Sequence, residues 1–213
     1  MNAFAAVIFF AAAAAPKAAR NARQLSSTYI QRDKLTAADA VVGDDFGYPV
    51  AIDGDTVVVG AWQRPNGGSG NAYVFRTSDG GAMYGLVAKL TAADASSLDW
   101  FGHSVAIDGD TVVVGAFRDN DDGTDSGSAY VFRTSDGGAT YVEVAKLTAS
   151  DAAASDIFGR SVAIDGDTVV IGAIGDDDAG SNSGSAYVFR TTDGGVTYGQ
   201  VAKLTADDAA AND

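Results

Sequence analysis

Residues 101–116 read FGHSVAIDGDTVVVGA, and nearly the same stretch returns at residues 46–61 and 158–173. A Lys-Leu-Thr-Ala tetrapeptide follows the same repeat. It starts at Lys34, Lys89, Lys146 and Lys203, with spacings of 55, 57 and 57 residues. Self-similarity at a fixed period of this size indicates one supersecondary unit used repeatedly. The structure of one unit therefore predicts the fold of the whole chain.

One unit contains four predicted strands. Residues 101–107 and 111–116 form the first two, joined by an Asp-Gly turn, because Asp-Gly between apolar runs is a strong hairpin signal. After a polar loop, residues 129–133 and 141–147 form the third and fourth strands. The second strand lacks alternation, which predicts that both of its faces are buried, whereas the fourth is expected to be half exposed. Four antiparallel strands in one repeat are typical of a β-propeller blade.

The predicted fold class is therefore all-β, with about three blades of four antiparallel strands in an incomplete or open propeller. A short apolar helix is expected before them, within residues 1–23. Its apolar run, Ala3 to Ala15, is too short to span a bilayer. Its length suits the core of a secretory signal peptide, with an Ala-rich helix or a wrongly assigned gene start as alternatives.

The repeat divides the chain unevenly. An outer strand of a preceding blade and blade 1 are expected at 24–88, blade 2 at 89–145, blade 3 at 146–202 and the start of a truncated blade at 203–213. Propellers close with about four to eight blades. The chain is thus expected to be a fragment of a longer one, a homo-oligomer that completes the ring, or an open arc. Exposed blade faces aggregate, which favours the first two.

The chain is strongly acidic, with a formal charge of −14, and nearly all of its acids are Asp. This charge argues against nucleic acid as a partner, because phosphates need Lys and Arg. It is consistent with a solvated, self-repelling surface, and with cations or a basic partner. The absence of Cys excludes disulfides and thiolate chemistry.

Two resemblances follow from these motifs. Phe-Gly followed by Gly-Ala, as at Phe101-Gly102 and Gly115-Ala116, resembles the FG-GAP repeat, the blade unit of integrin α-subunit propellers. This resemblance covers about residues 28–213 and implies a propeller with an extracellular adhesion or ligand-binding role. Residues 134–141 and 191–198 are similar to the Asp-box of sialidase-type propellers, a structural hairpin between the third and fourth strands. The first copy has Met83 in place of the Thr.

The resemblance to integrin-type blades also implies a calcium loop between the first two strands. Here that loop is only Asp108-Gly109-Asp110 and its copies, and two carboxylates cannot supply the six to eight oxygens that calcium needs. The acids gather instead in the following loop. We expect no tightly held cofactor, and at most weak calcium binding there, at Asp119, Asp121, Asp125, Asp176 and Asp178. The alternative is a solvated loop.

That loop and the linker between blades are expected on the same face. The linkers add Asp39, Asp44, Asp45, Asp94, Asp99, Asp151 and Asp156. This acidic loop face is the predicted site for a protein or carbohydrate ligand.

Enzyme chemistry finds little support in the sequence. His103 is the only His, and its copies are Tyr48 and Arg160. Arg76, Arg133 and Arg190 recur at equivalent places, as structural residues do. The predicted function is a non-enzymatic binding or adhesion module, secreted or at the cell surface. The alternatives are a structural segment of a larger surface protein and, more distantly, a sialidase-like or lyase-like enzyme. Trp62 and Trp100 break the repeat, and a Trp pair beside a pocket would favour binding.

Overall fold

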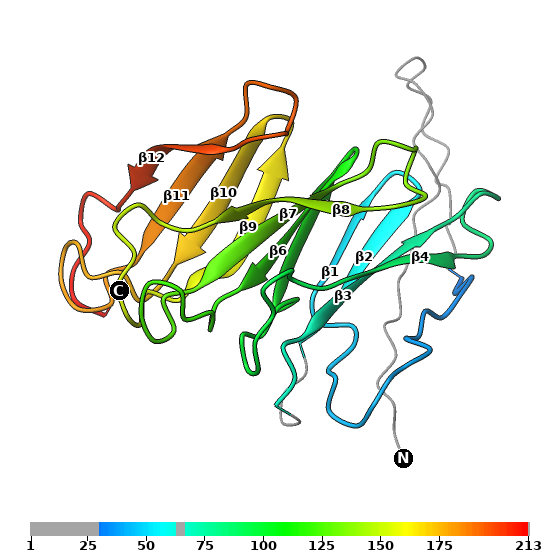
Figure 1. Cartoon of the computed structure of the whole chain (residues 1–213), viewed down its shortest axis with the longest axis horizontal. Helices are drawn as coiled ribbons and strands as arrows, with labels where there is room; N and C mark the ends of the chain where they lie inside the picture. Colours follow the sequence, from blue (N-terminus) through cyan, green and yellow to red (C-terminus); the bar gives the residue numbers. More distant parts are fainter. Residues whose placement is uncertain (1–29, 63–66, 213) are drawn as a thin grey trace, which may run out of the picture.

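The computed structural model describes residues 30–62 and 67–212 as three four-stranded sheets (Figure 1). The first sheet holds β1 (Val50–Asp53), β2 (Thr56–Ala61), β3 (Asn71–Arg76) and β4 (Gly85–Leu90). The second holds β5 (Ser104–Asp108), β6 (Thr111–Ala116), β7 (Ser128–Arg133) and β8 (Val142–Leu147). The third holds β9 (Phe158–Asp165), β10 (Thr168–Ala173), β11 (Ser185–Arg190) and β12 (Gly199–Leu204). The predicted N-terminal helix lies outside the described residues.

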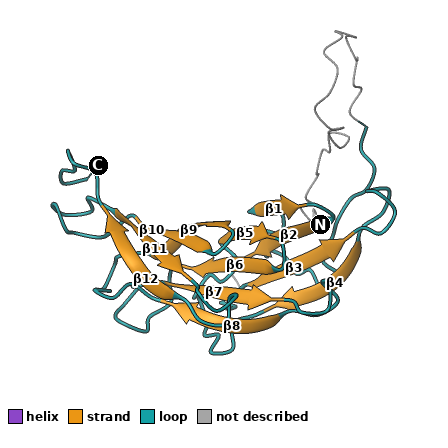
Figure 2. Ribbon diagram, turned by 90° about the horizontal axis from the view of Figure 1, so that it is seen from above, coloured by secondary structure: helices purple, strands orange, loops and turns teal. Residues whose placement is uncertain are grey.

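Each sheet is an antiparallel meander in chain order, as predicted for a blade. We call these sheets blades 1, 2 and 3. Seen from above, they form an arc with β1, β5 and β9 at one edge and β4, β8 and β12 at the other (Figure 2). We call these the inner and outer edges. The described residues contain no helix, so the all-β prediction is confirmed for this part of the chain.

The hairpins and the burial pattern follow from the sequence. Gly109 has a φ of 52°, which is the left-handed conformation that a two-residue hairpin turn needs and that Gly adopts readily. Every residue of β6 is buried, whereas β8 is mostly half exposed, as the two patterns predicted.

Aromatic residues fill the contacts between blades. Phe101 and Phe158 are completely buried, one at each of the two interfaces. Each Phe of a Phe-Gly pair packs edge-on against two rings of its own blade. The Phe101 ring lies 5.5 Å from Tyr130 and 5.9 Å from Phe132. The Phe-Gly motif is therefore part of the inter-blade core, as predicted.

Backbones approach closely where the Gly-Ala motif lies. A Cβ added to Gly115 would stand 2.0 Å from the carbonyl oxygen of Gly159 in blade 3. A Cβ on Gly60 would meet the carbonyl oxygen of Gly102 at 2.1 Å. The glycines at these two positions are therefore required by packing between blades.

The hairpins also join neighbouring blades. The Asp53 carboxylate accepts the Gly109 N–H at 2.8 Å, and Asp108 accepts the Gly166 N–H at 2.6 Å. The Arg133 guanidinium donates to the Gly194 carbonyl of blade 3. These residues hold the blades in register, a structural role that extends beyond the turn formation predicted for the Asp residues.

Some apolar side chains that are buried between blades in one copy are open in another. Val50 and Ile52 of β1 are 49% and 48% exposed, whereas their copies Val105 and Ile107 are each 9% exposed. Leu204 of β12 is 52% exposed, against 3% for Leu147. Covering of these faces by a second copy or by further chain stays a prediction. Sedimentation equilibrium on the full chain tests it, and a compact monomer would contradict the oligomer.

In the described part of the chain, no helix is both long and apolar enough to span a bilayer.

Candidate functional site

Two groups of residues stand out at one end of the arc. The strand directions place the loops β2–β3, β6–β7 and β10–β11 at the same end as the linkers between blades, and the hairpins lie at the other (Figure 1). We call the first the loop end. The acids of these loops and linkers therefore share one end, as the strand order predicted.

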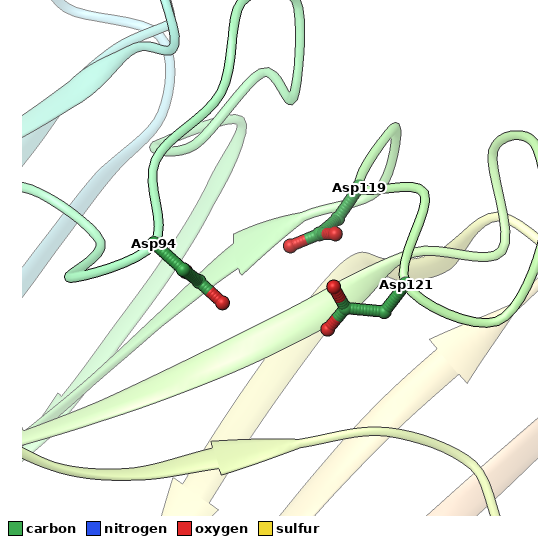
Figure 3. Close-up of side chains that lie close together, drawn as sticks. All are labelled: Asp94, Asp119 and Asp121. Carbon is green, nitrogen blue, oxygen red and sulfur yellow. The ribbon is translucent and has the colours of Figure 1, made fainter.

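An aspartate–lysine cluster lies at the outer edge of blade 2. The carboxylates of Asp94, Asp119 and Asp121 point toward one another from a linker and the β6–β7 loop (Figure 3). The Lys146 Nζ lies among them, 2.6 Å from Asp94, 3.1 Å from Asp119 and also paired with Asp121. The Tyr130 hydroxyl lies 2.8 Å from Asp94 and 2.6 Å from Asp119.

Blade 3 repeats this cluster. The Lys203 Nζ lies 2.7 Å from Asp151 and 2.9 Å from Asp176, and it also pairs with Asp178. The Tyr187 hydroxyl donates to Asp176. In blade 1 the described residues keep only the pair of Lys89 and Asp39, at 2.5 Å, with the Tyr73 hydroxyl 2.9 Å from Asp39.

Charge pairing governs the ionisation of these clusters. Burial lowers the pKa of Lys146, but the carboxylates of Asp121, Asp94 and Asp119 outweigh it and raise the pKa well above its usual value. Burial raises the pKa of Asp94, but hydrogen bonds from Lys146 and Tyr130 bring it below its usual value. Both groups are therefore charged at neutral pH, and the lysine supplies positive charge where three carboxylates meet.

The clusters show which of the predicted calcium ligands come together, but they do not test whether calcium binds. Asp119 and Asp121 come together, as do Asp176 and Asp178, but their third partners are Asp94 and Asp151 from the linkers. Asp125 lies apart and pairs with Arg118. In each cluster a lysine ammonium already lies among the carboxylates. Weak calcium binding at these residues stays a prediction. Titration calorimetry with CaCl₂ tests it, and no heat up to several millimolar would contradict it.

Asp99 lies beside the blade 2 cluster, and there the Ser96 hydrogen bond and the Lys146 charge lower its pKa too little to outweigh burial. Its side chain is buried and accepts the Ser96 N–H at 2.6 Å. Burial is the main cause that raises the pKa of Asp99 to about 6, and the nearby charges of Asp119 and Asp94 add to it. The linker thus holds a carboxylate that burial makes harder to ionise.

The second group forms a pocket of about 470 Å³ at the inner edge of the loop end. We call it the ring pocket. It draws residues from all three blades and the linkers that join them. Its lining residues are Tyr48, Trp62, Trp100, His103, Phe117, Arg118, Asp125, Ile157, Arg160 and Ile174.

Four rings of the pocket contact one another edge to face in a closed cycle. Trp62 lies 4.9 Å from Trp100, and Trp100 lies 5.0 Å from Phe117. His103 completes the cycle, 4.5 Å from Phe117 and 5.2 Å from Trp62. Edge-to-face pairs at these separations are favourable, so the rings form a rigid floor. Tyr48, whose ring lies 5.8 Å from His103, extends the cycle to the surface and is 60% exposed.

Two arginines cover this floor. The Arg118 guanidinium lies 4.3 Å from the centre of the Trp100 ring and pairs with Asp125 at 3.2 Å. The Arg160 guanidinium lies 4.7 Å from the centre of the Phe117 ring, and its Nη1 lies 2.9 Å from the His103 Nε2. Among the described residues, no carboxylate lies within ion-pair distance of Arg160.

The pocket consists of positions at which the three copies differ. The residue after Phe-Gly is Tyr48, His103 or Arg160, and the residue after Gly-Ala is Trp62, Phe117 or Ile174. All six line the pocket. The aspartate–lysine clusters, by contrast, are copied from blade 2 to blade 3. Repeated positions thus build the framework, and the six variable positions after the Phe-Gly and Gly-Ala motifs meet in one pocket.

Part of this site was predictable from the sequence. Trp62 and Trp100 were expected to matter if they flanked a pocket, and they do. Phe117, Ile157 and Ile174 were missed. Alignment of the three copies would have found them, because each neighbours a constant motif yet differs between copies.

The other end of the arc carries the second hairpin of each blade. The Asp136 carboxylate accepts from the Thr134 hydroxyl and from the Ala139 and Thr140 backbone, and Asp193 does the same in blade 3. These turns lie between the third and fourth strands, away from the ring pocket. The likeness to Asp-boxes stays a prediction.

Comparison with known protein families identifies the repeat. The sequence profile described as the FG-GAP repeat matches residues 29–75, 84–132 and 141–189. The second and third matched units each run from the fourth strand of one blade to the third strand of the next, and the first ends in β3. No curated protein matches the chain.

Among solved structures, the crystal structure of Saccharomyces cerevisiae Sqt1 aligns with a TM-score of 0.49 and 13% identity, over 78% of this chain and 37% of that one. This similarity is too low to carry an argument. The family profile, which matches three consecutive copies over most of the chain, shows that the protein belongs to the FG-GAP repeat family.

Proposed function

We propose that this chain is a non-enzymatic binding module that takes its ligand at the ring pocket. The observation that carries this proposal is the gathering of unrepeated residues. The residues that follow Phe-Gly and Gly-Ala differ in every blade and all line one pocket, while the Phe-Gly and Gly-Ala motifs themselves stay constant. A purely structural repeat gives no reason for this, because the same three blades would pack with identical residues at these positions.

The pocket has the composition of a binding site. Ligand pockets are mostly apolar and aromatic, with a few polar groups that fix orientation, and usually measure roughly 300–1,000 Å³. Here a floor of rings is joined by two arginines and one aspartate, in about 470 Å³. The pocket lies at the loop end, where propellers commonly place their ligand sites.

The family match supports a non-catalytic role. FG-GAP repeats are typically non-enzymatic and occur in extracellular and surface proteins. We therefore propose a secreted or cell-surface location and an adhesion or recognition role. Secretion is tested by expressing the full chain in its host and looking for it in the medium or on the cell surface. Retention inside the cell would contradict it.

The pocket carries its own reporter. The chain has two Trp, and both line the pocket, so intrinsic Trp emission reports on this site alone. We expect small aromatic fragments to change the emission saturably. The double variant Tyr48→Ala/Ile174→Ala should weaken this response without unfolding, because the two side chains are 60% and 53% exposed.

Met83→Ala is the matched control, since Met83 is 72% exposed on a hairpin at the other end. It should bind as the unmodified chain does. A fragment panel that leaves Trp emission unchanged, or that responds equally in the double variant, would contradict the binding proposal. The structural role in a larger surface protein would then be the better account.

A further inference from the structure

Building on the proposed binding function, we propose that the ring pocket takes a carboxylate attached to an apolar group, with Arg160 as the residue that binds the carboxylate. The step from pocket to ligand class rests on the charges of the pocket and on which of them already have partners.

The two arginines of the pocket are not equivalent. Arg118 faces Asp125 through two contacts, with its Nε 3.2 Å from one carboxylate oxygen and its Nη2 3.3 Å from the other. Its charge is therefore balanced within the β6–β7 loop. Among the described residues, the Arg160 guanidinium makes a polar contact with the His103 imidazole and a cation–π contact with the Phe117 ring, and no ion pair. Neither contact neutralises a guanidinium, so Arg160 offers an uncompensated positive charge.

This charge is notable because its surroundings are acidic. The chain carries a net charge of −14, and the lysines of blades 2 and 3 each lie among three aspartates. Arg160 is nevertheless left without a carboxylate partner, and it is exposed to solvent. A guanidinium donates in a planar fork that matches a carboxylate, and such bonds are among the strongest that side chains make.

A cationic ligand fits the rings less well. Aromatic cages bind ammonium groups through open ring faces. Here guanidinium groups already lie over the Trp100 and Phe117 rings, at 4.3 and 4.7 Å from their centres. A cationic ligand would have to displace one of these guanidinium groups, and it would be repelled by their positive charge. The positions taken by the arginines thus favour an anionic group.

The apolar part of the ligand follows from the remaining lining. Tyr48 and Ile174 are each more than half exposed, and both line the pocket with Arg160. An apolar body would cover their exposed surface, which is the favourable term in most binding. A carboxylate on that body would then reach the guanidinium.

Three matched probes test this inference: phenylacetate, its neutral amide phenylacetamide, and the cation phenethylamine. Their affinities are measured by Trp emission on the full chain. We expect phenylacetate to bind at least tenfold more tightly than phenylacetamide, and phenethylamine to bind most weakly. The variant Arg160→Met should bring phenylacetate down to the affinity of the amide and leave the amide unchanged.

Arg190→Met is the control, because Arg190 is exposed and belongs to the other end of blade 3. It should keep the preference for the acid. Equal binding of acid and amide, or an acid preference that survives Arg160→Met, would overturn the carboxylate assignment while leaving the binding function in place. Tighter binding of phenethylamine would show a cation cage instead. Failure of all three probes and of the wider fragment panel would overturn both proposals.

Discussion

The aspartate–lysine clusters and the ring pocket lie at the same end of the arc, and one loop contributes to both. The β6–β7 loop sends Asp119 and Asp121 to the outer edge and Phe117 and Arg118 to the inner edge. At the outer edge, blade 3 reproduces the same contacts with Lys203 and its aspartates. At the inner edge, the pocket residues after Phe-Gly and Gly-Ala differ in all three copies. Within this loop, the two aspartates, which recur in blade 3, build the blade, and Phe117 and Arg118, which do not recur, line the pocket.

The largest test of this division is a core substitution in the repeated framework. Phe132 is 3% exposed and packs at the interface of blades 1 and 2. Phe132→Ala should cost about 3–5 kcal/mol of unfolding free energy, as large-to-small changes at buried aromatic positions do. Its copy Phe189, 4% exposed, should behave alike. Urea unfolding measures both losses. A loss of less than about 1 kcal/mol at either position would break the equivalence of the blades.

The clusters give the second test. Lys146→Met leaves three carboxylates within 4.8 Å of one another, without their cation. We expect a loss of about 2 kcal/mol, below the value for a fully buried pair because the lysine side chain is 20% exposed. Lys203→Met should cost about as much.

Lys89→Met is the matched comparison, because Lys89 has one carboxylate partner among the described residues and its side chain is 39% exposed. Exposed pairs contribute roughly 0–1 kcal/mol, so its loss should be small. Thermal unfolding of the three variants at low salt compares them. Equal losses at Lys89 and Lys146 would show that the cluster adds nothing to a single pair.

A pH profile gives the third test, at Asp99. The pKa of Asp99 is raised to about 6 in the fold, against about 3.9 for an unperturbed Asp. The folded state therefore holds this proton more tightly. The contribution of Asp99 to the free energy of unfolding falls as pH rises from about 4 to 6. Above about pH 6 the cost of burying the charged carboxylate is fully present. Asp99→Asn should raise stability by about 1–2 kcal/mol at pH 7 and give no gain at pH 3.5.

Asp94→Asn is the opposite control. The pKa of Asp94 is lowered, so its carboxylate stabilises the fold above the unfolded pKa, and that contribution is lost as pH falls through the folded one. This variant should lose stability at pH 7. If Asp99→Asn also lost stability at pH 7, the buried carboxylate would be a needed partner in the framework and not a cost.

The sequence predicted the framework better than the pocket, for a physical reason. Burial of β6, the Asp-Gly turns and the Phe-Gly packing are local or repeated properties, so one copy contains them and the other two support them. The ring pocket arises only when Trp62, Phe117 and Arg160, from three blades, come within reach of each other. Sequence spacing says nothing about that distance. The lysines among the aspartates were missed for the same reason, since Lys146 belongs to β8 and its partners to two loops.

The smallest effect is expected at the hairpins of the other end, where the blades differ by one hydroxyl. Thr140 donates to the Asp136 carboxylate at 2.6 Å, and Thr197 does the same to Asp193. These hydroxyls are the first cause of the strongly lowered pKa of each aspartate. Asp79 has Met83 at that place, and the Thr77 hydroxyl is the first cause of its lowered pKa.

Met83→Thr should therefore lower the pKa of Asp79 further, which carboxyl NMR titration can follow, and raise the melting temperature slightly. Because a lowered pKa stabilises the fold above the unfolded value, the gain should vanish as pH falls through the folded pKa. Met83→Val, which matches Thr in shape but has no hydroxyl, should show neither change. A pKa shift in the Val variant would assign the difference between the blades to packing rather than to the hydrogen bond.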